Sequence, residues 1–169
     1  MRVSDIQLLF DFNYWANQLM LTHAAKLSDE QLVQPASFPY GNLLETLKHI
    51  LDSEYVWRTI CTHNRFMGQL VGREDLGTLA AISNVWQTEE KAMRAFLNSL
   101  SDGDLDRVVS YASDDGNGPV RERILWHCLV HVVNHGTQHR TQCAAMLKDM
   151  GQPVGSTDFT YFLNLHLHQ

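Results

Sequence analysis

Cysteine is scarce in this chain of 169 residues, and the placement of the three that occur excludes two classes of protein. Cys61, Cys128 and Cys143 are odd in number, lie within apolar stretches of helical periodicity and form no Cys-x-x-Cys pair. Such a pattern argues against a disulfide framework and against a thiolate metal site. We therefore expect three reduced cysteines in the core of a protein of the reducing cytoplasm.

Charge is also sparse, and none of it forms a basic patch. Charged residues make up 19% of the sequence, and the formal net charge is −6 at pH 7. Nucleic acids and anionic membranes are bound through clusters of Lys and Arg, so neither is an expected partner. No apolar run approaches the roughly 18 residues of a membrane span. Asp5 and Asp11 interrupt the apolar stretch near the N-terminus, which is not typical of a signal peptide.

Apolar residues, in contrast, are plentiful at 44% of the chain. This content excludes a disordered chain, and the length is near that of one domain, so we expect a single domain over 1–169. Apolar side chains recur at three- and four-residue spacing, which predicts amphipathic helices. The predicted helices cover about 4–26, 42–62, 78–100 and 119–150.

The segments between these helices contain recognisable start and stop signals. Ser4-x-x-Gln7 and Asn42-x-x-Glu45 are candidate capping boxes, and Thr78 precedes the third helix. The two prolines of segment 34–41 exclude a helix there. Strand-like residues followed by the turn cluster 114–118 predict a small hairpin or extended loop near 106–120.

The C-terminal part contains a second set of such signals. Gly151 and Pro153 end the fourth helix, and Thr157 or Asp158 can cap a short last helix. Four helices of this length can enclose one core. The expected fold class is therefore all-α, an up-down four-helix bundle with one long crossover.

Histidine is frequent, with nine in the chain, and four of them recur at four-residue intervals in the last long helix. With 100° per residue and Ile124 as the origin, the apolar face of this helix is centred near about 60°. His135 falls near about 20° and His139 near about 60°. His131 falls near about 340° and His127 near about 300°, so His127 is expected to point to water, while a contribution of His131 to the site stays open. His135 and His139 are thus expected to point into the bundle.

Two inward imidazoles one turn apart can chelate a metal, because side chains at i and i+4 share a helix face. Hydrogen-bonded core histidines are the other interpretation, and spacing alone leaves both open. A third ligand is expected in 42–62, where His49 and Glu54 interrupt the apolar seams. Periodicity allows His49 to face either the edge of the bundle or its interior. Because an unpaired Glu is rarely buried, Glu54 is expected at the rim near Arg58.

Several of these motifs resemble the DinB/YfiT-like family, a group of proposed metalloenzymes, in order along nearly the whole chain. The motifs are Phe12-Asn13-Tyr14-Trp15-Ala16-Asn17, Leu47-Lys48-His49-Ile50-Leu51 with Glu54 and Trp57, the run Asn134-His135-Gly136-Thr137-Gln138-His139-Arg140-Thr141-Gln142, and Gly151-Gln152-Pro153 with Asp158 and Tyr161. The third motif looks like the family's Asn-His-x-x-x-His-Arg-Gly-Gln signature. Thr141 replaces its usual Gly and, at about 260° on the wheel, points away from the core.

The resemblance implies a four-helix bundle, often a homodimer, that holds a divalent metal through His49, His135 and His139. Three imidazoles suit Zn²⁺ or Ni²⁺, and such a site keeps coordination positions open for chemistry. Family precedent favours a thiol-dependent S-transferase that uses a low-molecular-weight thiol and a small-molecule substrate. The alternatives are a metal-dependent hydrolase and a non-enzymatic, stress-induced binding or dimerisation module. A di-iron carboxylate site is disfavoured, because no Glu or Asp precedes any His by three residues.

Overall fold

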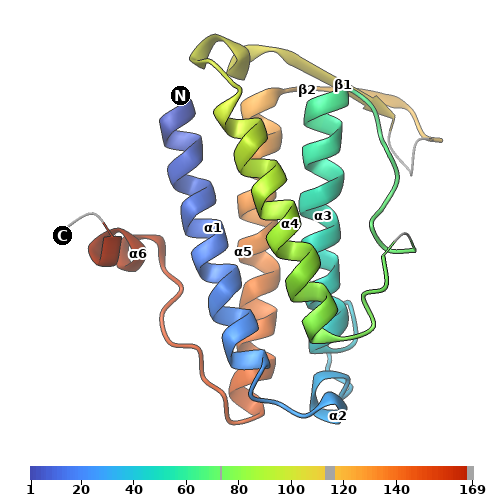
Figure 1. Cartoon of the computed structure of the whole chain (residues 1–169), viewed down its shortest axis with the longest axis vertical. Helices are drawn as coiled ribbons and strands as arrows, with labels where there is room; N and C mark the ends of the chain where they lie inside the picture. Colours follow the sequence, from blue (N-terminus) through green and yellow to red (C-terminus); the bar gives the residue numbers. More distant parts are fainter. Residues whose placement is uncertain (73, 113–116, 167–169) are drawn as a thin grey trace.

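Four long helices lie side by side and form a bundle in the computed structural model, which describes residues 1–72, 74–112 and 117–166 (Figure 1). They are α1 (Val3–Ala24), α3 (Leu43–His63), α4 (Leu79–Asn98) and α5 (Leu125–Asp149). In the view of Figure 1, α1 and α5 run downward, whereas α3 and α4 run upward. The connection 64–78 therefore returns along the length of the bundle between two parallel helices. This arrangement confirms the all-α bundle with one long crossover.

Of the N-caps predicted for the first three long helices, two are confirmed. The side chains of Asn42 and Thr78 accept hydrogen bonds from the backbone N–H three residues further on, at 2.9 and 3.2 Å. The capping box predicted at Ser4 is wrong, because the N-cap of α1 is Arg2. There the backbone N–H of Arg2 donates to the carboxylate of Asp5 at 2.9 Å, so the helix begins two residues earlier.

A hairpin closes one end of the bundle, as predicted for 106–120. Strand β1 (Val108–Ala112) pairs antiparallel with β2 (Val120–Ile124), after the 3₁₀ helix η1 (Asp102–Asp106). The last long helix therefore begins at Leu125 and not directly after Pro119 as predicted, because the backbone of 120–124 bonds to β1. Part of the predicted turn, residues 114–116, lies outside the described residues.

The C-terminal segment folds back against the bundle. Gly151, with φ of +77°, follows the end of α5, and Asp158 caps α6 (Phe159–His166) by accepting the N–H of Thr160 at 2.7 Å. The short C-terminal helix is thus confirmed. The ring of Phe162 in this helix packs on that of Phe12 in α1, with centroids 5.8 Å apart. A further single turn, α2 (Asp29–Leu32), was not anticipated from the sequence pattern.

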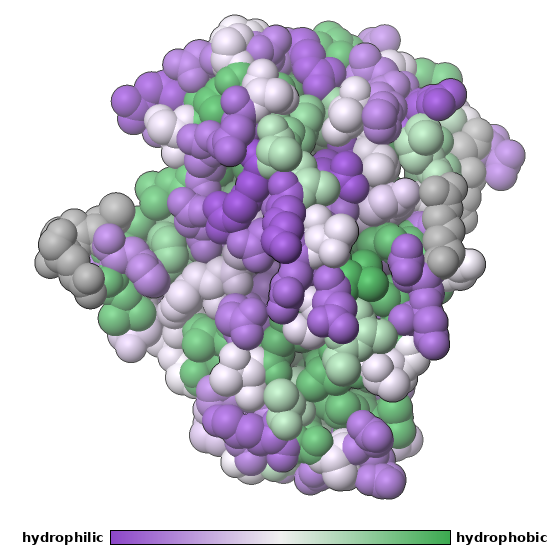
Figure 2. All heavy atoms as spheres, in the orientation of Figure 1, coloured by the Kyte–Doolittle hydropathy of each residue, from purple (hydrophilic) through white to green (hydrophobic). Residues whose placement is uncertain are grey.

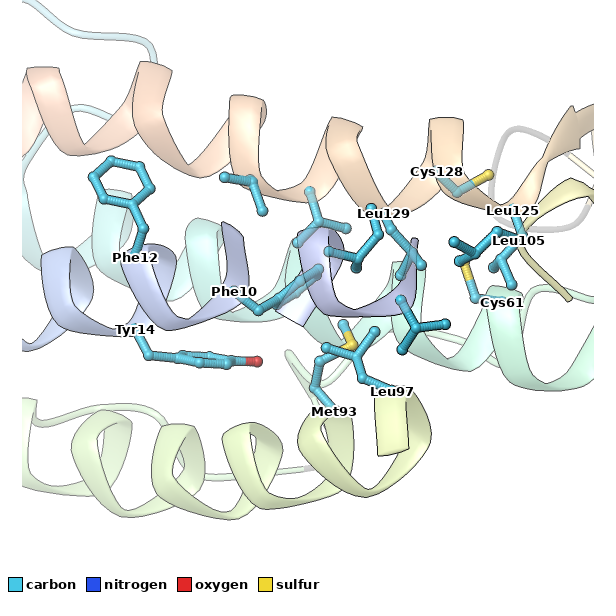
Figure 3. Packing of buried hydrophobic residues seen from close by; sticks show 14 of the residues in the cluster. Phe10, Phe12, Tyr14, Cys61, Met93, Leu97, Leu105, Leu125, Cys128 and Leu129 are labelled. Carbon is cyan, nitrogen blue, oxygen red and sulfur yellow. The ribbon is translucent and has the colours of Figure 1, made fainter. Parts of the chain in front are cut away.

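Apolar side chains fill the space between the four helices. Figure 3 shows Phe10 of α1, Met93 of α4 and Leu129 of α5 pointing toward one another, and all three are almost completely buried. Cys61 and Cys128 lie together near the hairpin end. All three cysteines are buried and free, which agrees with their predicted place in the core.

The outer face formed by α1 and α4 is largely hydrophilic along its middle, as Figure 2 shows. Within the part of the chain that the structure describes, no helix is both long and apolar enough to cross a membrane.

Candidate metal site

Three histidines meet where α3 and α5 pack against each other. The Nε2 atoms of His49 and His135 lie 3.1 Å apart. The ring of His139 is centred 4.8 Å from that of His49 and 4.5 Å from that of His135. One ligand nitrogen from each residue lies within 4.8 Å of the other two. These are the three residues that the family resemblance assigned to a metal.

The remaining histidines of α5 lie outside this cluster. His127 is exposed, as the helical wheel predicted, and so is His131, whose contribution the sequence left open. The ring of His131 packs on Trp57 at 4.9 Å, and its centroid is 5.6 Å from that of His135. The wheel therefore placed His127, His135 and His139 correctly.

The position of His49 settles a question that periodicity left open. This residue lies in the second turn of α3 and is half-buried against α5, so it faces the neighbouring helix and not the outer edge. His135 and His139 lie one turn apart on the facing side of α5, which brings all three rings together.

The surroundings keep two of the three imidazoles neutral at pH 7. Burial, together with the nearby His139, lowers the pKa of His49 to about 4. Burial likewise lowers the pKa of His135 to about 4, with contributions from His139 and His49. Neutral imidazoles offer the nitrogen lone pairs that a divalent metal requires. The donor set thus fits a divalent ion such as Zn²⁺ or Ni²⁺.

A glutamine fixes the orientation of the third imidazole. Nδ1 of His139 lies 2.9 Å from Oε1 of Gln142, so with this assignment Nδ1–H donates to the amide oxygen. The lone pair of His139 then resides on Nε2. Such a partner sets the tautomer and the direction of a metal-binding imidazole. Gln142 belongs to the signature of the last long helix, although the sequence alone gave it no role.

Tyr40 is a neighbour of the cluster that the sequence analysis missed. Its hydroxyl lies 2.7 Å from Nε2 of His49, and its ring stacks on that imidazole with centroids 3.9 Å apart. The edge of the same ring meets His139 at 5.3 Å. Tyr40 comes from the segment between α2 and α3, between Pro39 and Gly41. No periodicity connects this segment to a helix face, so the pattern gave no signal for its position.

A buried carboxylate lies one helical turn beyond His49. Glu54 is only 1% exposed, so the predicted rim position is wrong. Its Oε1 accepts hydrogen bonds from the amides of Asn13 and Asn17 at 2.7 and 2.8 Å, and its Oε2 accepts one from the indole of Trp86 at 2.9 Å. These donors replace the water that the carboxylate loses, although burial still raises the pKa of Glu54. The expected partner Arg58 pairs instead with Glu89, at 2.5 Å, and is not a partner of Glu54.

The same two asparagines connect Glu54 to a buried arginine beside the cluster. Nη1 of Arg140 donates to the amide oxygens of Asn13 and Asn17 at 2.5 and 2.8 Å, and its Nη2 donates to Thr137 at 2.9 Å. Burial lowers the pKa of Arg140 to about 10, which still leaves it charged at neutral pH. This network ties α1, α3 and α5 together at the level of the histidines. It therefore contributes to the register in which the three imidazoles meet.

Gly136 leaves the space that this network needs. A Cβ at Gly136 would lie 2.6 Å from Nη1 of Arg140 and 2.9 Å from Oδ1 of Asn13. Replacing Gly136 with Ala should gain about 1 kcal/mol in helix propensity. The overpacking should cost about 1–3 kcal/mol, because both groups are held by hydrogen bonds. We expect urea unfolding to show a net loss of about 1 kcal/mol. Gly103→Ala is the control, since a Cβ there meets only Ser101 at 3.9 Å; an equally stable Gly136→Ala protein would contradict this account.

The lowered pKa values predict an acid-sensitive metal-free protein. His49 and His135 titrate near pH 4 when folded and near 6.5 when unfolded, so the unfolded chain binds more protons between these values. Stability that is fully present above about pH 6.5 should decline steadily as the pH falls toward about 4. We expect the melting temperature of the metal-free protein to fall across this window, and metal to raise it at neutral pH.

The loss of stability that these two histidines cause at low pH can be separated from the loss caused by carboxylates. A protein with His49→Ala and His135→Ala should lose less stability than the unaltered protein over the same pH range. Equal slopes in the two proteins would contradict the assignment. The metal-free protein should stay folded at neutral pH, because its apolar core does not depend on an ion.

Comparisons with known proteins match this fold and sequence. The model of the DinB family matches residues 1–168. The uncharacterized protein YizA of Bacillus subtilis is 29% identical over 127 residues, which cover 75% of this chain and 78% of YizA. Protein DinB of Bacillus subtilis is 23% identical over 158 residues, covering 92% of this chain and 91% of that protein.

A solved structure has the same fold. The crystal structure of a DinB-like protein from Bacillus cereus superposes with a TM-score of 0.68 at 19% sequence identity. The match covers 92% of this chain and 97% of the other. At this identity the likeness establishes the fold and no particular chemistry.

Proposed function

Because the chain belongs to the DinB family, we propose that it is a metal-dependent enzyme whose ion is held by His49, His135 and His139, with a thiol-dependent S-transferase activity. The observation that carries the proposal is the convergence of three imidazole nitrogens within 4.8 Å of one another. Packing alone does not favour such a cluster, since each desolvated imidazole needs a polar partner.

The protein's own residues would prepare this site before an ion binds. Burial keeps His49 and His135 neutral, and the hydrogen bond to Gln142 leaves the lone pair of His139 on Nε2. A divalent ion with three imidazole ligands supplies Lewis acidity at its remaining coordination positions, where it favours the thiolate form of a bound thiol or lowers the pKa of water. Both uses need a site that is open to small molecules, and two of the three rings are only half-buried.

The proposed reaction joins a low-molecular-weight thiol to an electrophilic small molecule. The thiol sulfur forms a bond to an electrophilic carbon, the leaving group departs with the electrons of its bond, and the thiol proton passes to solvent. The positions of the imidazoles do not discriminate between this transfer and hydrolysis, which uses water in place of the thiol.

A cobalt-substituted protein provides the test. Thiols should add sulfur-to-cobalt absorption to its spectrum, and the wild-type protein should transfer those thiols to an electrophile, whereas His135→Ala should do neither. If the spectrum stays unchanged and the wild-type protein, but not His135→Ala, cleaves activated esters, the protein is a hydrolase and not a transferase. If neither response occurs, the chain is better described as a binding or dimerisation module.

A further inference from the structure

The phenol of Tyr40 contacts two of the three clustered histidines. Its hydroxyl is 2.7 Å from Nε2 of His49, and this nitrogen also faces Nε2 of His135 at 3.1 Å. Because the two rings stack, the hydroxyl lies over the face of the imidazole, close to the nitrogen that faces His135. Its ring is held from two directions, by the face of His49 at 3.9 Å and by His139 at 5.3 Å.

Metal binding would change the hydrogen bonding of this hydroxyl. A neutral imidazole has one nitrogen lone pair, and an ion bound at Nε2 of His49 uses it. The O–H of Tyr40 then loses the acceptor it has in the metal-free protein. In the part of the chain that the structure describes, its hydroxyl has no other protein acceptor within hydrogen-bonding distance.

The ring contacts of Tyr40 leave its hydroxyl free to act on a ligand beside the ion. The ring contacts with His49 and His139 do not involve the lone pair, so they can hold the phenol in place after an ion binds.

We propose that Tyr40 selects the ligand at the open coordination position by donating a hydrogen bond to a ligand atom that carries negative charge. This inference rests on the proposed function, since it requires an ion at the three histidines. The site is then expected to prefer small anionic ligands, such as a thiolate, over neutral nitrogen ligands such as imidazole. Once a neutral nitrogen ligand binds the ion, it has no lone pair left to accept a hydrogen bond from Tyr40. Hydrogen bonds to charged groups are stronger than those between neutral groups, which gives the phenol a selective effect.

Ligand binding to the cobalt-loaded protein tests the inference without any enzymatic assay. Azide serves as the anionic probe and imidazole as the neutral one, each followed by the visible cobalt spectrum. Tyr40→Phe keeps the ring and removes only the hydroxyl. We expect it to weaken azide binding about 10-fold or more, while imidazole binding and the affinity for Co²⁺ change less than about 3-fold. Tyr161→Phe, on the exposed surface of α6, should behave like the unaltered protein.

The outcomes separate this inference from the proposed function. If Tyr40→Phe binds azide as tightly as the unaltered protein, the inference is overturned and the metal site stands. A large loss of Co²⁺ affinity in Tyr40→Phe also overturns it, because the hydroxyl would then act on the ion or on His49 and not on the added ligand. If the unaltered protein does not bind Co²⁺, the proposed function is wrong, and the role of Tyr40 is wrong with it.

Discussion

Replacing His135 with alanine should abolish metal retention by the purified protein, with affinity for Zn²⁺ reduced by more than about 100-fold. The loss exceeds the 10- to 100-fold effect typical of residues that only support a ligand, because one of three imidazoles is removed outright. The Nε2 atom of His135 lies 3.1 Å from that of His49, within the cluster. Metal content after dialysis, for protein purified without metal-affinity resin, measures the effect.

His127→Ala is the matched control for this substitution. It removes an imidazole from the same helix, and the exposed ring of His127 packs on its neighbour Trp126 at 4.0 Å. Helix propensity improves slightly in both variants, so helical content should stay nearly unchanged. Equal loss of metal from the two proteins would show that retention depends on α5 in general and not on ligation by His135.

Arg140→Ala should destabilise the protein by about 3–5 kcal/mol, the cost of breaking a buried charge network by removing one partner. The substitution leaves the carboxylate of Glu54 buried at 1% exposure without a compensating charge, and it removes the donor to Asn13 and Asn17. Urea unfolding at pH 7 measures the change in the free energy of unfolding.

An exposed ion pair provides the comparison for Arg140. Arg94 is 41% exposed and pairs with Asp11 at 2.6 Å and with Glu90 at 2.8 Å, so Arg94→Ala should cost at most about 1 kcal/mol. Adding Glu54→Gln to Arg140→Ala removes the uncompensated charge and should recover part of the lost stability. If Arg140→Ala costs no more than Arg94→Ala, the buried network does not stabilise the fold.

The sequence was sufficient for the part of the site that lies on one helix. The directions of His135 and His139 depend on the helical period alone, and the apolar residues of the same helix mark its buried face. His49 lies on a different helix, and periodicity cannot state which side of one helix meets another. Its assignment therefore came from the family resemblance, and the structure places its ring beside the other two.

The features that were missed depend on contacts between distant segments. Glu54 is buried because α1 and α4 supply Asn13, Asn17 and Trp86 as donors, which no local pattern around Glu54 reveals. Tyr40 reaches the cluster from a connection without helical or strand periodicity. Likewise, residues 120–124 form a strand because they pair with β1, although the sequence after Pro119 was also compatible with a helix.

Anomalous X-ray diffraction from crystals of the zinc-loaded protein tests the central claim most directly. The account predicts one strong peak where α3 meets α5, with ring nitrogens of His49, His135 and His139 at about 2.0–2.1 Å from the ion. A peak held by His131 or His127 in place of these residues, or no peak at the cluster in zinc-saturated protein, would contradict it.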